Sequence, residues 1–186
     1  MKRPITLVLL GDIAAGKGTQ AKILAKKYHL KLIDVGVFSR KMAAKKKDFA
    51  RIRIGKLAPS NPVQKYLKRE LARLKSVQGL ILDGGKMPAE AKLIYRMLKK
   101  QRRKILVIYL TIPQTESFQR VTGRLKNESR HDDSPEAIKN RIRYYRDIYS
   151  KTVKFWNSKR VLKKVNGLGT VTQVNKRLVR TINESY

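Results

Sequence analysis

The sequence predicts an α/β fold in which a parallel sheet of about five strands carries helices on both faces. Apolar runs of strand length recur along the chain, and most of them do not alternate with polar residues. Such runs are typical of strands that are covered on both faces. Stretches of helix length separate the runs, as expected for a parallel sheet in a three-layer fold. A glycine-rich loop lies between the first run and the first helical stretch.

The expected strands are short and rich in Val, Ile and Leu; they are Ile5–Leu10, Leu30–Val35, Leu80–Leu82, Ile105–Leu110 and Val161–Val165. The expected helices lie between and after them, at Thr19–Tyr28, Pro62–Leu74, Pro88–Lys100, Pro113–Leu125, Ser134–Trp156 and Thr170–Ile182. Proline near a first turn and serine at a helix start are both common signals of a helix N-terminus. No repeat or low-complexity tract divides the chain, so we expect one domain.

The composition excludes several classes of protein. Hydrophobic residues make up 41% of the 186 residues, which argues against disorder. No apolar run approaches the roughly 20 residues of a membrane helix, and the short apolar start is interpreted as a buried strand rather than a signal peptide. The chain has no Cys and two His, which excludes disulfides, thiolate metal sites and a cysteine nucleophile. We therefore expect a cytoplasmic protein that does not insert into membranes, and a monomer.

The net charge indicates a negatively charged partner. Lys and Arg number 45 against 13 Asp and Glu, which gives a formal charge of +32. Single basic runs are usually solvated surface, but repulsion among so many cations works against compaction unless a polyanion or counter-ions screen it. Nucleotides, RNA and anionic surfaces are the expected partners. Dense runs occur at Lys45–Lys47, Lys99–Lys104 and Lys159–Lys164.

The glycine loop carries the strongest chemical signal. Gly11 and Gly16-Lys17 have the spacing of the phosphate-binding loop G-x-x-x-x-G-K, after a strand and before a helix. Backbone N–H groups and a helix N-terminus can surround an anion there, and Lys17 can reach the β and γ phosphates. Gly18 occupies the usual Ser/Thr place, and a hydroxyl follows at Thr19. The alternative is a glycine-rich turn that binds nothing.

The loop and four later segments resemble adenylate kinases and related nucleoside monophosphate kinases. GKGTQ (16–20) is that family's variant of the loop, and GLILDGG (79–85) resembles its third strand. The segments VIYLTIPQTESFQRVTGR, SRHDDSPEAIKNRIRYY and KVNGLGTVTQV follow in the family's order and spacing. The resemblance implies one adenylate-kinase-like domain over residues 1–186, with an acceptor-binding insert at about 36–76 and a short lid at about 125–133.

The resemblance also implies roles for residues on the ATP side. Phosphoryl transfer needs positioning and positive charge around the transferring group. Arg120 would lie against the donor base, Arg124 on the donor phosphates, and Arg130 and Arg141 over the γ phosphate, where ordinary surface charge is the alternative. Asp83 would hold Mg²⁺ through water. The adjacent Asp132 and Asp133 either belong to a lid hinge or only favour a helix N-terminus. The residues expected to bind ATP are Gly11, Ala14, Ala15, Gly16, Lys17, Gly18, Thr19, Arg120 and Arg124.

The acceptor side departs from the family pattern. The segment T-G-D-x-x-R reads Val35-Gly36-Val37-Phe38-Ser39-Arg40 here, so a hydroxyl and a carboxylate have become valines while Arg40 remains. The family's segment D-G-F-P-R-T has no counterpart of its arginine in this sequence. Lys86 takes that place if the alignment with the family contains a one-residue deletion. The ammonium of Lys86, a single point charge, then replaces a guanidinium that could pair with two phosphate oxygens at once. The expected acceptor-binding residues are Gly36, Arg40, Ala58, Lys86 and Glu90.

Glu90 raises the question of the acceptor base. With the same deletion it falls where the family has a base-reading glutamine. A carboxylate only accepts hydrogen bonds, which suits the two N–H donors of guanine better than the edge of adenine. GMP is therefore an alternative acceptor to AMP.

Two functions from different classes fit the sequence. The first is an enzyme that transfers the γ-phosphate of Mg²⁺-ATP to AMP, and the intact loop and the four arginines favour it. The second is a nucleotide-binding protein associated with RNA or a ribonucleoprotein, with weak or lost kinase activity; the charge and the altered acceptor residues favour that. No aromatic-rich RNA-recognition strand is visible in the sequence, so we favour the enzyme.

Overall fold

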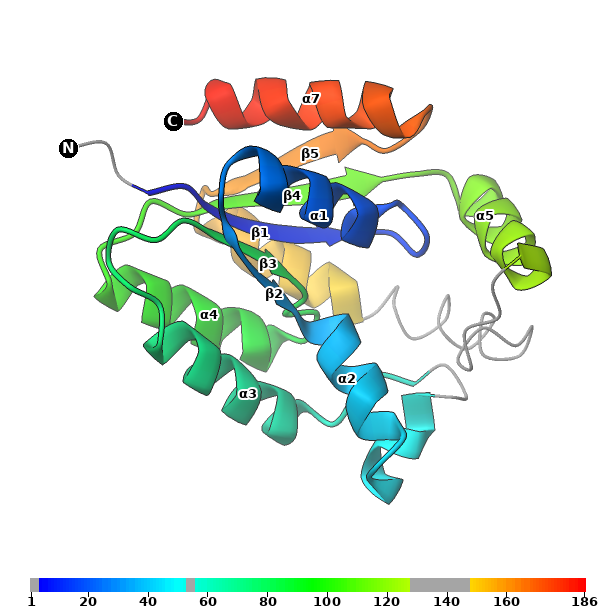
Figure 1. The fold of residues 1–186 in the computed structure, drawn as a ribbon, viewed down its shortest axis with the longest axis horizontal. Coiled ribbons are helices and arrows are strands. Elements are labelled where there is room, and N and C mark those ends of the chain that lie inside the picture. The colour runs from blue at the N-terminus through cyan, green and yellow to red at the C-terminus, as the bar shows by residue number, and fades with distance from the viewer. Residues whose placement is uncertain (1–3, 53–55, 128–147) are drawn as a thin grey trace.

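The computed structural model of the chain contains one five-stranded, fully parallel sheet (Figure 1). The model describes residues 4–52, 56–127 and 148–186. The strands lie in the order β2-β3-β1-β4-β5, and β1 pairs with both β3 and β4 through Val8 opposite Leu82 and Val107. The predicted fold class is confirmed. The strands are β1 (Thr6–Gly11), β2 (Lys31–Asp34), β3 (Leu80–Asp83), β4 (Leu106–Thr111) and β5 (Leu162–Asn166).

Helices cover both faces of this sheet, with α1 and α7 on one face and α3 and α4 on the other (Figure 1). A helical segment at residues 148–158 packs with α3 and α4, and its Trp156 is fully buried. None of the described helices is long and apolar enough to cross a membrane. The helices are α1 (Lys17–Lys27), α2 (Val35–Ala43), the 3₁₀ helix η1 (Lys47–Ile52), α3 (Ser60–Ala72), α4 (Pro88–Lys100), α5 (Gln114–Asn127) and α7 (Val171–Asn183).

The core has two layers because successive residues of a strand face opposite sides of the sheet. Val8 and Leu10 of β1 pack with α3 and α4, whereas Leu7 and Leu9 pack with α1 and α7. All four of these side chains are completely buried. A central strand with two covered faces must be apolar at every position, which is why the apolar runs of the sequence do not alternate.

The structure differs from the sequence prediction at the end of β2. The strand was expected to include Val35, but it ends at Asp34, and Val35 begins the unpredicted helix α2. The carboxylate of Asp34 accepts a hydrogen bond from the backbone N–H of Val37 at 2.8 Å. This bond caps the first turn of α2 and turns the chain out of the sheet. Of the helix expected at Ser134–Trp156, residues 134–147 lie outside the described part of the chain.

Candidate active site

A cleft of about 740 Å³ lies at the carboxyl edge of the sheet. The glycine loop after β1, the start of α2, the segment before α3, the end of β3 and the start of α4 all contribute to its lining. Because all strands are parallel, their carboxyl ends meet at this edge. Ligands of open α/β sheets bind in this position. The cleft therefore lies where a parallel α/β sheet commonly binds its ligand.

The loop after β1 has the backbone of an anion-binding loop. A side chain at Gly11 would collide with the backbone of Leu110, so only glycine allows β1 and β4 to approach so closely there. Gly16 has a φ of 85° and stands immediately before the first residue of α1, Lys17. Ala14 has a φ of 57°, a conformation that costs a non-glycine residue about 1 kcal/mol or more. The N-terminal N–H groups of α1 consequently face the cleft, where they can hold an anion.

Lys17 is fixed within this loop by the loop's own carbonyl groups. Its ammonium donates hydrogen bonds to the carbonyl oxygens of Gly11, at 2.9 Å, and Asp12, at 2.6 Å. Asp12 in turn accepts hydrogen bonds from the hydroxyl of Tyr109 at 2.6 Å and from the backbone N–H of Ile112 at 2.9 Å. Burial raises the pKa of Tyr109, and the bond to Asp12 raises it further, so this hydroxyl stays a donor. The loop is thereby tied to β4.

Arg120 of α5 joins the loop to the turn that follows β5. Its Nε donates to the carboxylate of Glu116 at 2.6 Å, and its Nη2 donates to the carbonyl oxygen of Gly167 at 3.2 Å. A longer hydrogen bond of 3.5 Å runs from Nη1 to the carbonyl oxygen of Ala14. The guanidinium also lines the cleft. The guanidinium of Arg120 thus lies between the loop after β1 and the turn after β5.

Asp83 is an acidic group next to the start of α1. Its Oδ2 lies 3.7 Å from the point where a side chain at Gly18 would begin, and it lines the cleft. Burial raises the pKa of Asp83, whereas the nearby Lys17 ammonium lowers it. Among the described residues, no group of three or more His, Cys, Asp or Glu comes together as a metal site. A single carboxylate beside an anion site fits Mg²⁺, which is usually held by one or two carboxylates, water and phosphate oxygens.

All five residues expected on the acceptor side line the same cleft as the loop. Gly36 and Arg40 come from α2, Ala58 from the segment before α3, Lys86 from the segment between β3 and α4, and Glu90 from the first turn of α4. Gly36 is closely enclosed, because Nη1 of Arg40 and Oδ1 of Asp34 each lie 3.1 Å from the position of a side chain there. The cleft therefore has two cationic sides, one at the loop and one at Arg40 and Lys86.

Glu90 is the buried acid of this second side. It is 3% exposed, and its Oε2 accepts a hydrogen bond from the backbone N–H of Met87 at 3.2 Å. Burial raises the pKa of Glu90 from its ordinary value of 4.5 to about 7, although the bond from Met87 and the charge of Lys86 oppose the change. At neutral pH this carboxyl group exists in both protonation states.

A sequence model of the family described as adenylate kinase matches residues 9–161. The chain belongs to the adenylate kinase family. Over nearly its whole length it is similar to the adenylate kinase of Leptospira biflexa, with 32% identity over 191 aligned residues that cover 98% of this chain and 100% of that protein. The adenylate kinase of Thermus thermophilus is 31% identical over 179 residues, covering 92% and 94% of the two chains. That of Mycobacterium ulcerans is 32% identical over 187 residues, covering 96% and 99%.

Some of the residues that the family resemblance assigned are not placed in the cleft by the structure. Gly11 does not line the cleft; it contributes a carbonyl to Lys17 instead. The backbone of Arg124 lies in α5, four residues after Arg120. Arg130 and Arg141 lie outside the described residues, as do Asp132, Asp133 and residues 128–133 of the expected lid.

Sequence reasoning missed three charged residues that line the cleft. Asp34 is the last residue of β2, and its carboxylate and the guanidinium of Arg40 both lie close to Gly36. An Asp between an apolar run and a helix is a recognisable N-cap signal, but the sequence did not show that a helix begins there. Lys22 and Lys56 also line the cleft. Nothing distinguishes these two lysines from the other cations of so basic a chain.

Proposed function

We propose that the protein is a nucleoside monophosphate kinase that transfers the γ-phosphate of ATP to AMP and forms two ADP. The observation that carries this proposal is the cleft itself, which the phosphate-binding loop and the acceptor-side residues line together. Two cationic sides of one cleft can bring two phosphorylated substrates into contact. Phosphoryl transfer requires this positioning more than it requires covalent chemistry. Membership in the adenylate kinase family supports the same reaction.

On the donor side, Lys17 and the backbone N–H groups of the loop hold the ATP phosphates. Their positive charge at the start of α1 complements the phosphates, which are strong hydrogen-bond acceptors. Arg120 lies between Ala14 and Gly167 and can cover one face of the adenine base. Arg124, Arg130 and Arg141 are assigned to the transferring phosphate by their place in the family's motifs. Their guanidinium groups can each pair with two phosphate oxygens.

On the acceptor side, Arg40 and Lys86 hold the phosphate of the nucleoside monophosphate. Glu90, on the same side of the cleft, contacts the base, with Ala58 offering backbone groups to it. The single-charge ammonium of Lys86 gives less directional binding than a second guanidinium would. Guanine fits the ionised form of Glu90, and adenine fits the protonated form, because only the protonated form both donates and accepts a hydrogen bond.

Asp83 is the residue that would hold Mg²⁺, through water and beside the phosphates of the nucleotide. Its carboxylate lies next to Gly18 and Lys17, at the loop that faces those phosphates. When bound, the ion would neutralise charge on the phosphate oxygens. Only the ionised form of Asp83 can serve here; burial raises the pKa of this carboxyl group and opposes ionisation, whereas the charge of Lys17 favours it.

A coupled phosphoryl-transfer assay tests the proposal. Purified protein freed of nucleic acid receives ATP and Mg²⁺ with AMP, GMP, CMP or UMP in turn. We expect turnover within the range of roughly 1 to 100 per second that kinases show, with AMP or GMP as the preferred acceptor. Absence of turnover with all four acceptors, in a protein that still binds ATP, would contradict the proposal.

Lys17→Ala is the matching variant, with Lys26→Ala as its control. Lys26 is exposed at the last turn of α1, so its replacement removes the same charge from the same helix at the other end. We expect Lys17→Ala to lower kcat/KM by about 10²- to 10³-fold, the loss typical of one charge-stabilising group. Equal activities of the two variants would show that Lys17 has no special role.

RNA association is the second candidate function, and the charge of +32 favours it. Small nucleotides in one cleft do not need 45 cations, because charges more than a few Debye lengths away are screened. This function does not compete with kinase activity if a different surface carries it.

A further inference from the structure

The amino edge of the sheet, opposite the cleft, gathers many of the basic residues of the described chain. Since all five strands are parallel, the segments that lead into them and the end of α7 share this edge, where the C-terminus lies (Figure 1). Five segments form it, namely residues 26–31, 69–79, 99–105, 159–161 and 180–186, and we call them the basic edge. They hold fourteen lysines and arginines and two acids: Lys26, Lys27, Lys31, Arg69, Arg73, Lys75, Lys99, Lys100, Arg102, Arg103, Lys104, Lys159, Arg160 and Arg180, with Glu70 and Glu184.

Both acids of the basic edge already have cationic partners. Glu70 pairs with Lys31 at 3.6 Å and with Arg69 at 3.2 Å, and Glu184 pairs with Arg180 at 2.8 Å. The remaining cations, apart from the buried Arg103, project into solvent as exposed side chains. Within the described residues, the edge therefore presents more positive charge than its own acids neutralise. Mutual repulsion makes such an arrangement unfavourable without an anionic partner.

Two arginines of the basic edge occupy backbone positions that favour glycine. Arg102 follows α4 with a φ of 52°, and Arg160 follows the helical segment 148–158 with a φ of 54°. Helices commonly end in this left-handed conformation, and glycine is the usual residue because it adopts it without strain. Each of these two positions thus carries an arginine although glycine would relieve the strain of the backbone. This is expected if the guanidinium groups bind something.

Aromatic rings lie among these cations. The Lys159 ammonium is 5.5 Å from the ring centre of Tyr95 and 5.6 Å from that of Phe155. The Lys104 ammonium is 5.3 Å from the ring centre of Tyr186, a side chain that is 39% exposed. Cations interleaved with accessible rings are the usual surface for single-stranded nucleic acid, in which phosphates pair with the cations and bases stack on the rings.

Buried contacts make the basic edge rigid. Arg103 is 5% exposed, and its guanidinium donates to the carbonyl oxygens of Lys75, at 2.7 Å, and Gln78, at 2.8 Å. The hydroxyl of Tyr186 donates to the carbonyl oxygen of Lys104 at 2.6 Å, and it accepts from the backbone N–H of Thr6 at 2.9 Å. Three of the five segments are thus held to one another and to β1. A preformed surface loses less entropy when it binds a partner.

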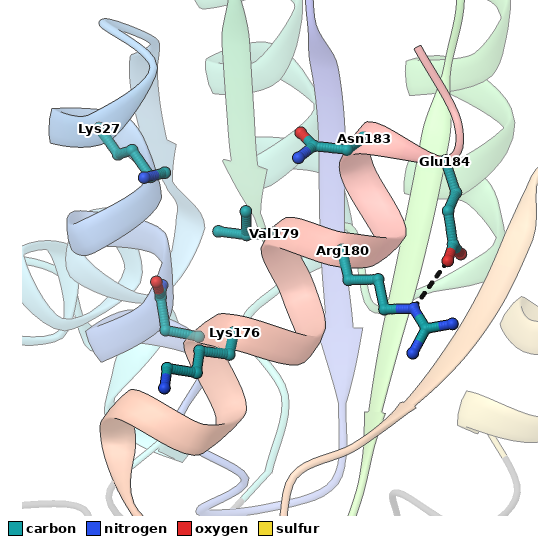
Figure 2. Close-up of a pocket in the computed structure, with 7 residues that line it drawn as sticks. Lys27, Lys176, Val179, Arg180, Asn183 and Glu184 are labelled. Atoms are coloured by element: carbon teal, nitrogen blue, oxygen red, sulfur yellow. Dashed lines mark hydrogen bonds and ion pairs between the residues drawn. The ribbon is translucent and has the colours of Figure 1, made fainter.

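A groove of about 560 Å³ between α1 and α7 opens beside this edge (Figure 2). Lys27 comes from α1 and Lys176 from α7, so a cation stands on each wall, while Arg180 of α7 is turned toward Glu184 and pairs with it. Asn175 and Asn183 line the same groove, where Asn175 donates one hydrogen bond to Gln20 at 2.9 Å and Asn183 accepts one from the Tyr28 hydroxyl at 3.3 Å, which leaves each amide a further donor. Amides can both donate and accept hydrogen bonds, which suits the edges of nucleobases.

We propose that the basic edge and the adjoining groove bind single-stranded RNA, independently of the nucleotide cleft at the opposite edge. RNA fits better than an anionic membrane because the exposed large apolar side chains of the edge are limited to Val77 and Tyr186. Membrane-surface binding relies on a broad apolar face or a flexible polybasic segment. The rings of this edge instead lie beside cations, and the groove contains amides.

The test measures fluorescence anisotropy of a labelled RNA of roughly 20 nucleotides at about 50 to 300 mM salt, without ATP. The variant is Arg102→Gly with Arg160→Gly, which removes two charges and relieves two strained backbones. Lys65→Gln with Lys68→Gln is its control, because it removes the same charge from exposed positions in the middle of α3. Thermal melting of both variants verifies that they fold.

We expect the wild type to bind with an affinity that falls steeply with salt. The arginine variant should melt no lower than the wild type, bind about tenfold more weakly at 100 mM salt and lose about 1.4 from the salt slope, as two phosphate contacts require. The control should change affinity by less than about twofold. Equal losses in both variants would overturn the proposal, because the binding would then follow total charge. Tighter binding to phosphatidylserine vesicles than to RNA would also overturn it.

Kinase turnover distinguishes this proposal from the proposed function. The arginine variant should keep the wild-type turnover, since the basic edge lies at the opposite end of the strands from the cleft. RNA binding should likewise survive Lys17→Ala. If the arginine variant loses turnover along with RNA binding, the two edges are not independent and the proposal fails. An inactive wild type that binds RNA at this edge would refute only the kinase assignment.

Discussion

At the scale of single residues, the proposed function predicts that the protonation of Glu90 controls which base the acceptor side of the cleft binds. The carboxyl group is 3% exposed, and its raised pKa of about 7 places both forms at neutral pH. The protonated form donates one hydrogen bond and accepts others, as an amide does, whereas the ionised form only accepts. Adenine presents an acceptor beside a donor, and guanine presents two donors. The preferred acceptor should therefore depend on pH.

Glu90→Gln tests this dependence. In the wild type, KM for AMP should rise several-fold between about pH 6 and pH 8, while KM for GMP should fall, because the carboxyl group ionises through its pKa near 7. The glutamine variant cannot ionise, so its KM for AMP should stay constant and its KM for GMP should stay high. Steady-state kinetics with AMP and with GMP across this pH range measure both KM values. Parallel profiles in the two proteins would show that Glu90 does not read the base.

Glu90 should also make the stability of the folded protein depend on pH. Its pKa is about 7 in the folded protein and near the ordinary 4.5 in the unfolded chain. An acid with a raised pKa stabilises the fold most below the unfolded value, and that contribution is lost as pH rises through the folded value. At pH 8, Glu90→Gln should therefore raise the free energy of unfolding by up to roughly 3 kcal/mol. Urea unfolding at pH 5 and pH 8 checks this, and a larger gain at pH 5 would contradict it.

At the scale of elements, the nucleotide loop owes its position to β4. Asp12 is the link, since it accepts hydrogen bonds from Tyr109 of β4 and from Ile112 just after it. The carbonyl oxygens of Gly11 and Asp12 then hold the Lys17 ammonium. The strand β4, which is adjacent to β1 in the sheet, thus orients the cation of the loop.

Tyr109→Phe should weaken this link without emptying the space that the ring fills. The loss of a hydrogen bond of 2.6 Å to a carboxylate should cost about 1 to 2 kcal/mol of stability and lower ATP affinity several-fold. Tyr28→Phe is the control, because the Tyr28 hydroxyl bonds to Asn183 at 3.3 Å, away from the loop. Urea unfolding and calorimetric titration with ATP measure the two effects. Unchanged ATP affinity in Tyr109→Phe would show that the loop holds its shape without β4.

The sequence predicted elements well where local pattern and tertiary structure agree. All five strands appear within a residue or two of their expected bounds, because the central strands are covered on both faces and must be apolar, although the edge strand β5 exposes Lys163 and Lys164. Helix α2 was missed because Val35 continues the apolar run of β2, and only the cap from Asp34 shows where the strand ends. The prediction that Lys86 and Glu90 belong to the site was based on the family resemblance rather than on a local sequence pattern. The closeness of Asp34 and Arg40 depends on how α2 leaves the sheet, which no local pattern encodes.

At the scale of the whole molecule, charge is distributed unequally between the two edges of the sheet. Asp12, Asp34 and Asp83 stand at or just after the carboxyl ends of strands, beside the cations of the cleft. The basic edge has fourteen cations and two acids. The cleft can therefore bind small anions with balanced local charge, while the opposite edge keeps a strong positive potential.

This imbalance predicts an unusual response of stability to salt. With 45 cations and 13 acids, most cations have no acid to pair with one to one, so repulsion outweighs attraction among the surface charges. Salt screens both, and the Debye length falls from about 20 Å near 20 mM salt to about 6 Å near 300 mM. The melting temperature should consequently rise by several degrees over this range. Lys99→Gln with Lys100→Gln, which removes two exposed cations at the end of α4, should melt higher than the wild type at low salt and show a smaller rise. Differential scanning calorimetry at constant pH measures both. A melting temperature that falls with salt would mean that ion pairs such as Arg120–Glu116 contribute more to stability than the excess charge costs.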